Sequence, residues 1–226
     1  MDKKIIQGVL LLLVFSIGLL LLLPRDDSRN TPETLPWHIA HPTPETSKVF
    51  GVTLGESTVG QVEKYFNDES EISLFKAGNG KMTVESYFDE VNFNGLKAKV
   101  VLNVTIPEDI LTGMFNRGLR MNGTPSGTGK RITLTPDDLE VVRKSPVATL
   151  TYMPTVRIED AILKKRFGEP AERIKEKESG NEHWLYPQQG LDITLGGQEK
   201  PVLQYISPKD FDLLRTPLLA QGELLK

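Results

Sequence analysis

Cysteine is absent from this sequence of 226 residues, which excludes disulfide bonds and a lipid-modified N-terminal cysteine. Histidine is scarce, with 3 copies, and basic residues do not outnumber acidic ones, so the formal net charge is −3. The chain lacks the positive balance that is typical of nucleic-acid-binding proteins, and no polybasic run marks a site for anionic lipid. We therefore expect no nucleic-acid partner.

Charge is also missing from residues 5–23, an apolar run in which Gln7 and Ser16 are the polar side chains. As an α-helix this run would be roughly 28 Å long, close to the ~30 Å hydrocarbon core of a bilayer. The alternative is a cleaved signal peptide, whose apolar region usually has about 7–15 residues and ends at an A-x-A-like site. This run is longer and no such site follows it. We therefore predict a cytoplasmic stub and an uncleaved transmembrane helix over residues 1–23.

The sequence indicates the orientation of this helix less clearly than it indicates the helix itself. Lys3 and Lys4 precede the apolar run, and Arg25 and Arg29 follow it, so the positive-inside rule gives a tie. A short stub before a large domain is the usual layout of a signal anchor, and a domain without cysteine suits an extracytoplasmic location. We expect the N-terminus in the cytoplasm and the C-terminal domain outside it.

Residues 24–46 are rich in proline, and the tetrapeptide Thr-Pro-Glu-Thr occurs at 31–34 and again at 43–46. This composition favours extended polyproline II structure at about 3.1 Å per residue, so the segment would span up to ~70 Å. We interpret it as a linker. In the alternative, Trp37 returns to the membrane interface, where indole rings are favoured.

From residue 47 onward, several landmarks recur in the same order. A short amphipathic helix is predicted to end at Phe66 and another at Phe167, which is 101 positions later. Pro107 and Pro208, each at the start of a short helix, are separated by the same number of positions. Between these marks lie two turn signals, Asn79-Gly80 and Gly180-Asn181, each followed by an aromatic strand. The order favours duplication over coincidence.

Each copy predicts short helices followed by a meander of antiparallel strands. Apolar and polar side chains alternate along 96–105 and along 191–195, the period of a strand with one buried face. We divide the chain into a first repeat at 47–118, an inter-repeat loop and helix at 119–147, and a second repeat with a C-terminal tail at 148–226. The predicted fold class is α+β, with an N-terminal transmembrane helix followed by two such repeats.

The second copy resembles the BamE (SmpA/OmlA) family of bacterial envelope domains. The resemblance is carried by residues 158–167, Gly168-Glu169-Pro170, Trp184-x-Tyr186-Pro187 and Gly190-Leu191-x-Ile193. It covers residues 150–207 well and residues 50–105 loosely. It implies helices packed on a three-stranded antiparallel sheet. Tandem copies of a similar unit form the secreted β-lactamase inhibitor proteins, so the resemblance also implies a binding surface rather than an enzyme.

Groups suited to metal binding or nucleophilic catalysis do not converge in the sequence. His38 and His41 lie in the proline-rich segment without a third ligand. His183 stands beside Trp184 on a predicted strand, and no G-x-S-x-G elbow accompanies it, so we expect a structural or surface role.

The remaining motifs also have structural explanations. Residues 123–130 fail the phosphate-loop pattern, because Thr124 replaces its first glycine and Arg131 follows its lysine, and we predict a hairpin tip there. Asp137, Asp138 and Glu140 open a helix, where acidic side chains complement the helix dipole. We predict no cofactor, no metal site and no catalytic residue.

Aromatic side chains are the candidates for partner binding: Trp184, Tyr186 and Tyr87. Trp184 and Tyr186 share a strand face, which either packs in the core or forms an exposed platform of the kind that anchors binding hot spots. The leucine-rich tail at 211–225 either docks on the sheet or binds a partner.

Together these features predict a non-enzymatic, membrane-anchored scaffold or accessory subunit that binds another envelope protein. The resemblance implies the bacterial cell envelope, and the uncleaved helix then predicts a single-pass protein of the inner membrane with its C-terminal domain in the periplasm. The alternatives are a lipid- or peptidoglycan-binding envelope module and a hydrolase acting on envelope polymers.

Overall fold

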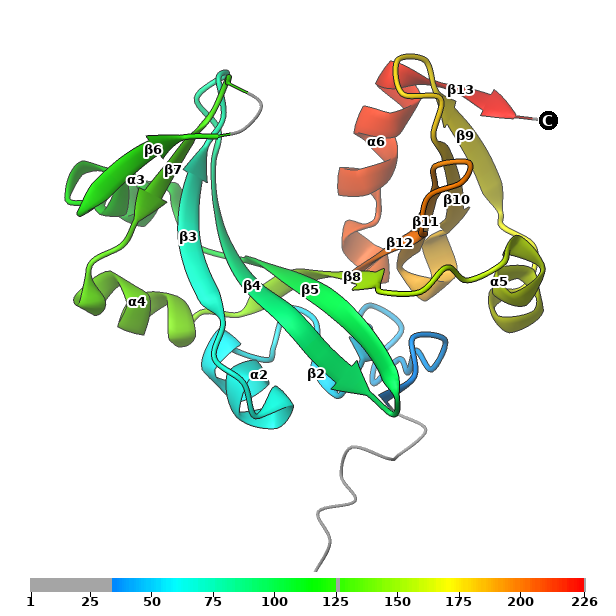
Figure 1. Cartoon of the computed structure of the whole chain (residues 1–226), viewed down its shortest axis with the longest axis horizontal. Coiled ribbons are helices and arrows are strands. Elements are labelled where there is room, and N and C mark those ends of the chain that lie inside the picture. Colours follow the sequence, from blue (N-terminus) through cyan, green and yellow to red (C-terminus); the bar gives the residue numbers. More distant parts are fainter. Residues whose placement is uncertain (1–33, 125–126, 226) are drawn as a thin grey trace, which may run out of the picture. The chain divides into compact units, whose positions relative to one another are not determined.

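The structure, a computed structural model, describes residues 34–124 and 127–225 (Figure 1). An antiparallel sheet of 11 strands dominates them, in the order β13-β9-β10-β11-β12-β8-β5-β4-β3-β7-β6, and β1 and β2 form a separate two-stranded sheet. The strands are β1 Lys48–Val49, β2 Val52–Thr53, β3 Glu71–Lys76, β4 Met82–Phe93, β5 Leu96–Val104, β6 Arg120–Gly123, β7 Lys130–Thr133, β8 Val147–Pro154, β9 Glu172–Glu176, β10 Glu182–Tyr186, β11 Leu191–Leu195, β12 Val202–Ile206 and β13 Gly222–Leu225. The helices are α2 Val59–Phe66, α3 Glu108–Asn116, α4 Pro136–Arg143, α5 Asp160–Phe167 and α6 Asp212–Gln221, with 3₁₀ turns η3 Pro187–Gln189 and η4 Pro208–Asp210.

Local sequence signals explain how the helices begin and end. At the start of α2, the Thr58 hydroxyl accepts from the backbone N–H of Gln61 at 3.3 Å, and the Gln61 side-chain oxygen accepts from the N–H of Thr58 at 2.9 Å. This capping box satisfies two donors that the first helical turn leaves without partners. The helix ends at Asn67, whose φ of 51° is left-handed.

The predicted fold class was wrong. The described residues form a mostly antiparallel sheet with short helices rather than two separate α+β repeats behind a membrane helix. Strand β8 is the reason, because Thr151 of β8 pairs with Val101 of β5 on one side and with Gln204 of β12 on the other. These contacts join strands far apart in the chain into one sheet, and no local pattern specifies them.

Among the described residues, no helix is both long enough and apolar enough to cross a membrane. The predicted transmembrane helix over residues 1–23 lies outside the part of the chain that the structure describes.

Residues 34–46, which we interpreted as the end of an extended linker, are folded against the sheet. The hydroxyl of the fully buried Tyr205 donates to the carbonyl of Pro36 at 2.7 Å. The N–H of Ala40 donates to the carbonyl of Lys48 at 2.9 Å, which bridges the segment to β1. The prolines here shape turns that pack, and the apolar surface they cover outweighs the preference for an extended chain.

The inter-repeat segment is also more ordered than predicted. Residues 120–123 and 130–133 form the hairpin β6–β7, which extends the sheet beside β3. The predicted helix after Thr135 is present as α4, with the Thr135 hydroxyl accepting from the N–H of Asp138. Glycine, serine and threonine in the turn concealed the short strands, because they have no alternating apolar pattern.

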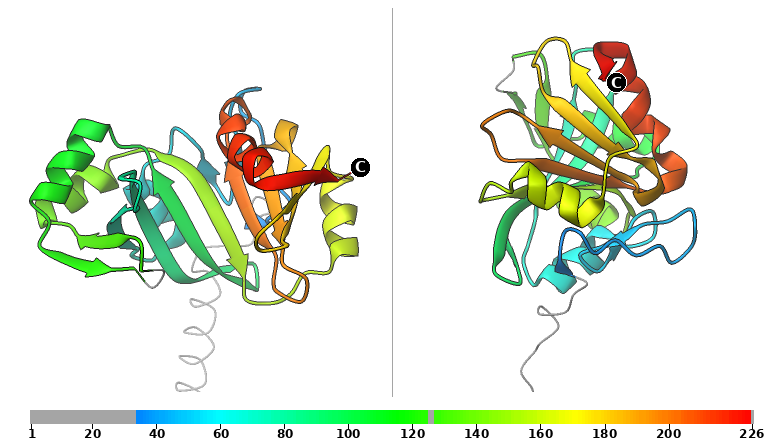
Figure 2. Two further views of the ribbon diagram at one scale, coloured as in Figure 1. Left: turned by 90° about the horizontal axis from the view of Figure 1, so that it is seen from above. Right: turned by 90° about the vertical axis from the view of Figure 1, so that its right-hand side faces the viewer.

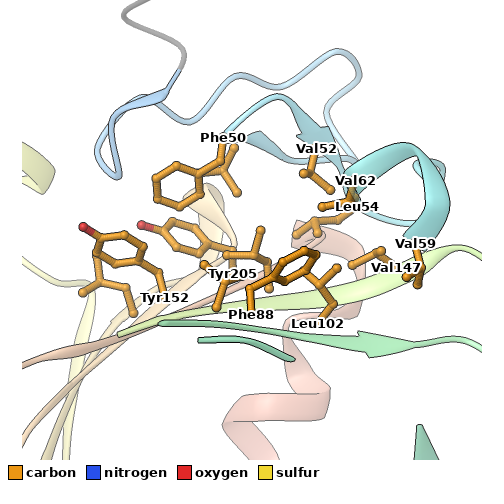
Figure 3. Close-up of a cluster of buried hydrophobic side chains, with 14 of the residues drawn as sticks. Phe50, Val52, Leu54, Val59, Val62, Phe88, Leu102, Val147, Tyr152 and Tyr205 are labelled. Carbon is orange, nitrogen blue, oxygen red and sulfur yellow. The ribbon is translucent and has the colours of Figure 1, made fainter. Parts of the chain in front are cut away.

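One large core lies on a single face of the sheet, between the strands and helices α2 to α5. Its centre is drawn in Figure 3, where Phe50 from the β1–β2 turn lies near Tyr152 of β8 and Tyr205 of β12. The ring of Phe50 stacks on Phe93 at 4.3 Å and on Tyr152 at 5.0 Å between centroids. Phe50 has a φ of 51°, unusual for a side chain of its size, and the tight hairpin turn with Gly51 directs its ring into the core.

Helix α6 packs on the opposite face of the sheet from α5, as both views in Figure 2 show. Beneath it lies a smaller apolar cluster formed by Ile174, Leu185, Ile206 and Phe211, with Leu214 and Leu218 of α6 partly buried against it. Among the described helices, only α6 covers this face.

Candidate binding surface

Helix α6 covers β9 to β12 and leaves the same sheet face uncovered over β3, β4, β5 and β8 (Figure 1). We call this uncovered area the open face. It carries the side chains that alternate with the core residues of these strands. The side chains of the open face include Ser73, Glu85, Tyr87, Lys99, Val101, Asn103, Thr149, Thr151 and Met153.

A row of polar side chains crosses the middle of the open face. Ser73, Glu85, Asn103 and Thr149 are successive cross-strand partners on β3, β4, β5 and β8. Arg131 donates from Nε to the Ser73 hydroxyl at 2.9 Å, and Asn103 donates from Nδ2 to the Thr149 hydroxyl at 3.1 Å. The two ends of the row are therefore fixed by hydrogen bonds.

Glu85, in the middle of this row, is half-buried and forms no hydrogen bond or ion pair with any described residue. Burial raises the pKa of its carboxyl above the ordinary value, because the ionised form loses water. The nearby charges are already matched, since Arg131 pairs with Glu71 and Lys99 pairs with Asp89. Glu85 is thus an acceptor without a donor on an accessible surface.

Tyr87 lies next to this row and its ring is held in one orientation. Its hydroxyl donates to Asp89 Oδ1 at 2.6 Å and accepts from Lys99 Nζ at 2.9 Å. Lys99 Nζ also donates to Asp89 Oδ1 at 2.9 Å and lies 5.6 Å from the centre of the Tyr87 ring. The hydrogen bonds from Tyr87 and Lys99 hold the pKa of Asp89 below its ordinary value. A fixed aromatic ring loses little conformational entropy when a partner covers it.

Beyond Lys99 the open face ends in a hollow of about 480 Å³. Met153 and Pro154 of β8 form one wall, and Pro201 and Val202 at the β11–β12 hairpin form another. The apolar walls with Lys99 at one edge suit an apolar side chain flanked by a polar group.

The structure places the three predicted aromatic residues in two different environments. Trp184 and Tyr186 belong to the core, with 3% and 4% of their surface exposed, so they do not form an exposed platform. Trp184 Nε1 donates to Glu182 Oε1 at 2.6 Å, and the Tyr186 hydroxyl donates to the carbonyl of Gly168 at 3.0 Å. Burial raises the pKa of Tyr186 to about 12. Tyr87 alone of the three lies on the open face.

His183 is buried beneath α6 rather than on the surface. Its Nδ1 lies 2.9 Å from Asp192 Oδ2, and its Nε2 lies 3.5 Å from Glu176 Oε1. Burial opposes protonation of the imidazole, but the hydrogen bond and charge of Asp192 and the charge of Glu176 outweigh it and raise the pKa of His183. Burial raises the pKa of Asp192 as well. The arrangement is an internal polar cluster, closed to substrate by its burial.

The other motifs also have structural partners. His41 Nδ1 lies 3.0 Å from the carbonyl of Thr46. Asp138 is buried and accepts from Arg117 Nε at 3.0 Å, so it holds α4 to the end of α3 in addition to its place in the first helical turn. The predicted hairpin tip at residues 123–130 is bounded by the paired strand residues Gly123 of β6 and Lys130 of β7, and residues 125 and 126 within it lie outside the described part of the chain. Within the described residues, no group of three acidic, histidine or cysteine side chains is placed to bind a metal.

Sequence reasoning missed Glu85, Lys99, Met153 and the hollow. The alternation along 96–105 places Lys99 on the solvent-facing side of its strand, where a lysine is unremarkable, and no pattern identified Glu85 or Met153. Their significance depends on β8, whose pairing with β5 brings Met153 beside Lys99. No protein-family model, no curated protein and no solved structure matches the chain.

Proposed function

We propose that this chain is a non-enzymatic binding module of the bacterial cell envelope, which holds another protein against its open face. The observation that carries the proposal is Glu85, a half-buried acceptor without a partner among the described residues, in the middle of the polar row and next to the fixed Tyr87 ring. Partial burial has removed some of the hydration of this carboxylate, so a hydrogen-bond donor from a bound partner would stabilise its ionised form.

The chemistry of the open face supports a protein as its ligand. A tyrosine, a methionine-lined hollow and matched charges at the edge resemble the composition of interface centres with polar rims. Lys99 and Asp89 are exposed and already paired, so they suit the polar rim of a contact, where charged groups stay accessible to water.

Location is part of the proposal. The apolar residues 5–23 would tether the module to the inner membrane, with the C-terminal domain in the periplasm. Because residues 34–46 are folded with the sheet, a reporter belongs at the C-terminus and not after residue 46. Alkaline phosphatase fused after Lys226 should be active in cells, and an inactive enzyme at normal expression would contradict a periplasmic domain.

Photo-crosslinking tests the binding surface. Benzoylphenylalanine replaces Thr151 on the open face of the full chain, and the control replaces Glu178, which is exposed in the β9–β10 turn. The proposal predicts one protein adduct from the Thr151 position in intact cells and none from the Glu178 position. Adducts with lipid alone at Thr151 would favour the lipid-binding alternative, and equal protein adducts at both positions would reject a specific surface.

A further inference from the structure

Positive charge collects on two neighbouring hairpins, β3–β4 and β6–β7, at one edge of the sheet. Residues 72–84 and 117–134 contain Lys76, Lys81, Arg117, Arg120, Lys130 and Arg131 and no aspartate or glutamate. The two stretches are far apart in the sequence, so neither forms a polybasic run. The fold brings them together.

The β3–β4 and β6–β7 hairpins are joined through strand pairing and through contact of their turns. Lys76 of β3 is the cross-strand partner of Lys130 of β7, and the N–H of Ala77 donates to the carbonyl of Lys81 at 2.9 Å across the β3–β4 turn. A Cβ atom at Gly78 would lie 3.0 Å from the carbonyl oxygen of Thr128, so the two turns are in van der Waals contact. Figure 1 shows the two hairpins, β3–β4 and β6–β7, side by side at one edge of the sheet. We call this region the hairpin end.

Most of its charge is uncompensated. Arg117 pairs with Asp138, and Arg131 pairs with Glu71. Lys76, Lys81, Arg120 and Lys130 form no ion pair with any described residue, and Lys76 Nζ lies 4.2 Å from the centre of the Phe115 ring. Like charges directly opposite each other destabilise a sheet, so the Lys76–Lys130 pairing opposes folding.

Exposed apolar side chains accompany these charges. Leu119 is 65% exposed and Met121 is 46% exposed, and Met121 lies on β6, which forms one edge of the sheet. A protein surface of cations beside exposed leucine and methionine suits a bilayer interface, where the cations meet lipid phosphates and the apolar side chains enter the acyl boundary. We propose that the hairpin end binds the surface of an anionic phospholipid bilayer.

This proposal does not depend on the open face: Arg131, which borders both regions, already pairs with Glu71 and is unchanged in every variant tested. The test uses the full chain in nanodiscs of phosphatidylcholine, which hold residues 5–23 in lipid. Flotation then measures binding of these nanodiscs to separate vesicles of phosphatidylcholine alone or mixed with phosphatidylglycerol. Empty nanodiscs provide the background.

We expect binding to the phosphatidylglycerol vesicles and none to phosphatidylcholine. The K81E/R120E/K130E variant should bind at least on the order of 100-fold more weakly, since each of these three exposed basic residues near an anionic surface adds roughly fivefold in affinity. The control K175E/K177E/K209E changes the same number of exposed basic residues elsewhere and should retain binding.

A neutral variant, K81Q/K130Q, separates binding from folding. It should weaken vesicle binding while its melting temperature stays equal to that of the wild type or rises. Absence of wild-type binding to phosphatidylglycerol vesicles would overturn the proposal. Equal losses in the two triple variants would overturn it too, because they would indicate an effect of net charge alone.

Discussion

At the scale of single residues, the proposed binding depends on Glu85, and the raised pKa of its carboxyl predicts a measurable pH dependence of stability. Burial raises the pKa of the folded carboxyl above the unfolded value, so folding favours its protonated form. The contribution of Glu85 to stability is therefore fully present below the unfolded pKa and is lost as the pH rises through the folded pKa.

Replacing Glu85 by glutamine should remove this pH dependence. At neutral pH the variant should be as stable as the wild type, or slightly more stable. The expected gain is below about 1 kcal/mol, because the partial exposure of Glu85 reduces the effect. Urea unfolding at acidic and neutral pH measures it. Glu90→Gln, an exposed residue paired with Lys97, is the control and should change little. A marked loss of stability in Glu85→Gln at neutral pH would show that the carboxylate has a structural partner.

The buried pair of His183 and Asp192 stabilises the fold and has no part in the proposed binding surface. The raised pKa of His183 means that its charged form stabilises the fold below its unfolded pKa, and that this stabilisation is lost as the pH rises through the folded pKa. His183→Gln should cost roughly 3 kcal/mol, because it leaves Asp192 buried without a counter-charge, and Asp192→Asn should cost less, because Glu176 remains 3.5 Å from His183 Nε2.

The double variant should cost less than the sum of the two single losses. Urea unfolding of the four proteins around the cycle provides the coupling free energy. Strict additivity would mean that the two side chains do not act as a pair.

At the scale of elements, the turn between η3 and β11 depends on a glycine. Gly190 has a φ of +63°, and a Cβ atom there would lie 2.0 Å from the carbonyl oxygen of Ile206. Gly190→Ala should therefore cost clearly more than the roughly 1–2 kcal/mol of a left-handed alanine. Gly197 has a φ of +60° and open space around it, so Gly197→Ala should show the conformational cost alone. Thermal unfolding of both compares them, and similar losses would contradict the close approach to Ile206.

The elements also show how far sequence reasoning reached. Both predicted helix ends, Phe66 and Phe167, close helices in the structure, and capping and amphipathic spacing are local signals that explain this. The halves then diverge: β3, β4 and β5 form a meander of three strands, whereas β9 to β12 form one of four. Strands β6, β7 and β13 extend the edges. These additions depend on long-range pairing, which the spacing of landmarks cannot specify.

The candidate site was less predictable than the elements. Tyr87 was identified as an aromatic residue on a strand, but Trp184 and Tyr186 had the same signal and are buried. Alternation separates the two faces of a strand without showing which face a distant helix covers. Here α6, from the leucine-rich tail, covers one part of a face and leaves the rest open.

At the scale of the whole molecule, the segment 34–46 is fastened to the distant strand β12 through Tyr205. Tyr205→Phe removes the hydrogen bond to the Pro36 carbonyl and should cost about 1 kcal/mol or slightly more. Tyr152→Phe is its matched control, because the buried Tyr152 hydroxyl has no hydrogen-bond partner among the described residues. That variant should be neutral or stabilising.

Limited proteolysis distinguishes the two tyrosine variants further. Cleavage within residues 36–46 should become faster in Tyr205→Phe and stay unchanged in Tyr152→Phe. Equal protection in both variants would show that other contacts hold the segment in place.

The central claim is that the open face holds a protein through Glu85, and the crosslink from position 151 tests it most directly. Crosslinking yield is measured in intact cells for the full chain with benzoylphenylalanine at this position, alone and combined with Glu85→Gln or Glu90→Gln. We expect one protein adduct that Glu85→Gln reduces at least about fivefold, the effect of losing a net hydrogen bond of about 1 kcal/mol, and that Glu90→Gln leaves unchanged. An adduct of the same yield in all three proteins, or no protein adduct at all, would contradict the claim.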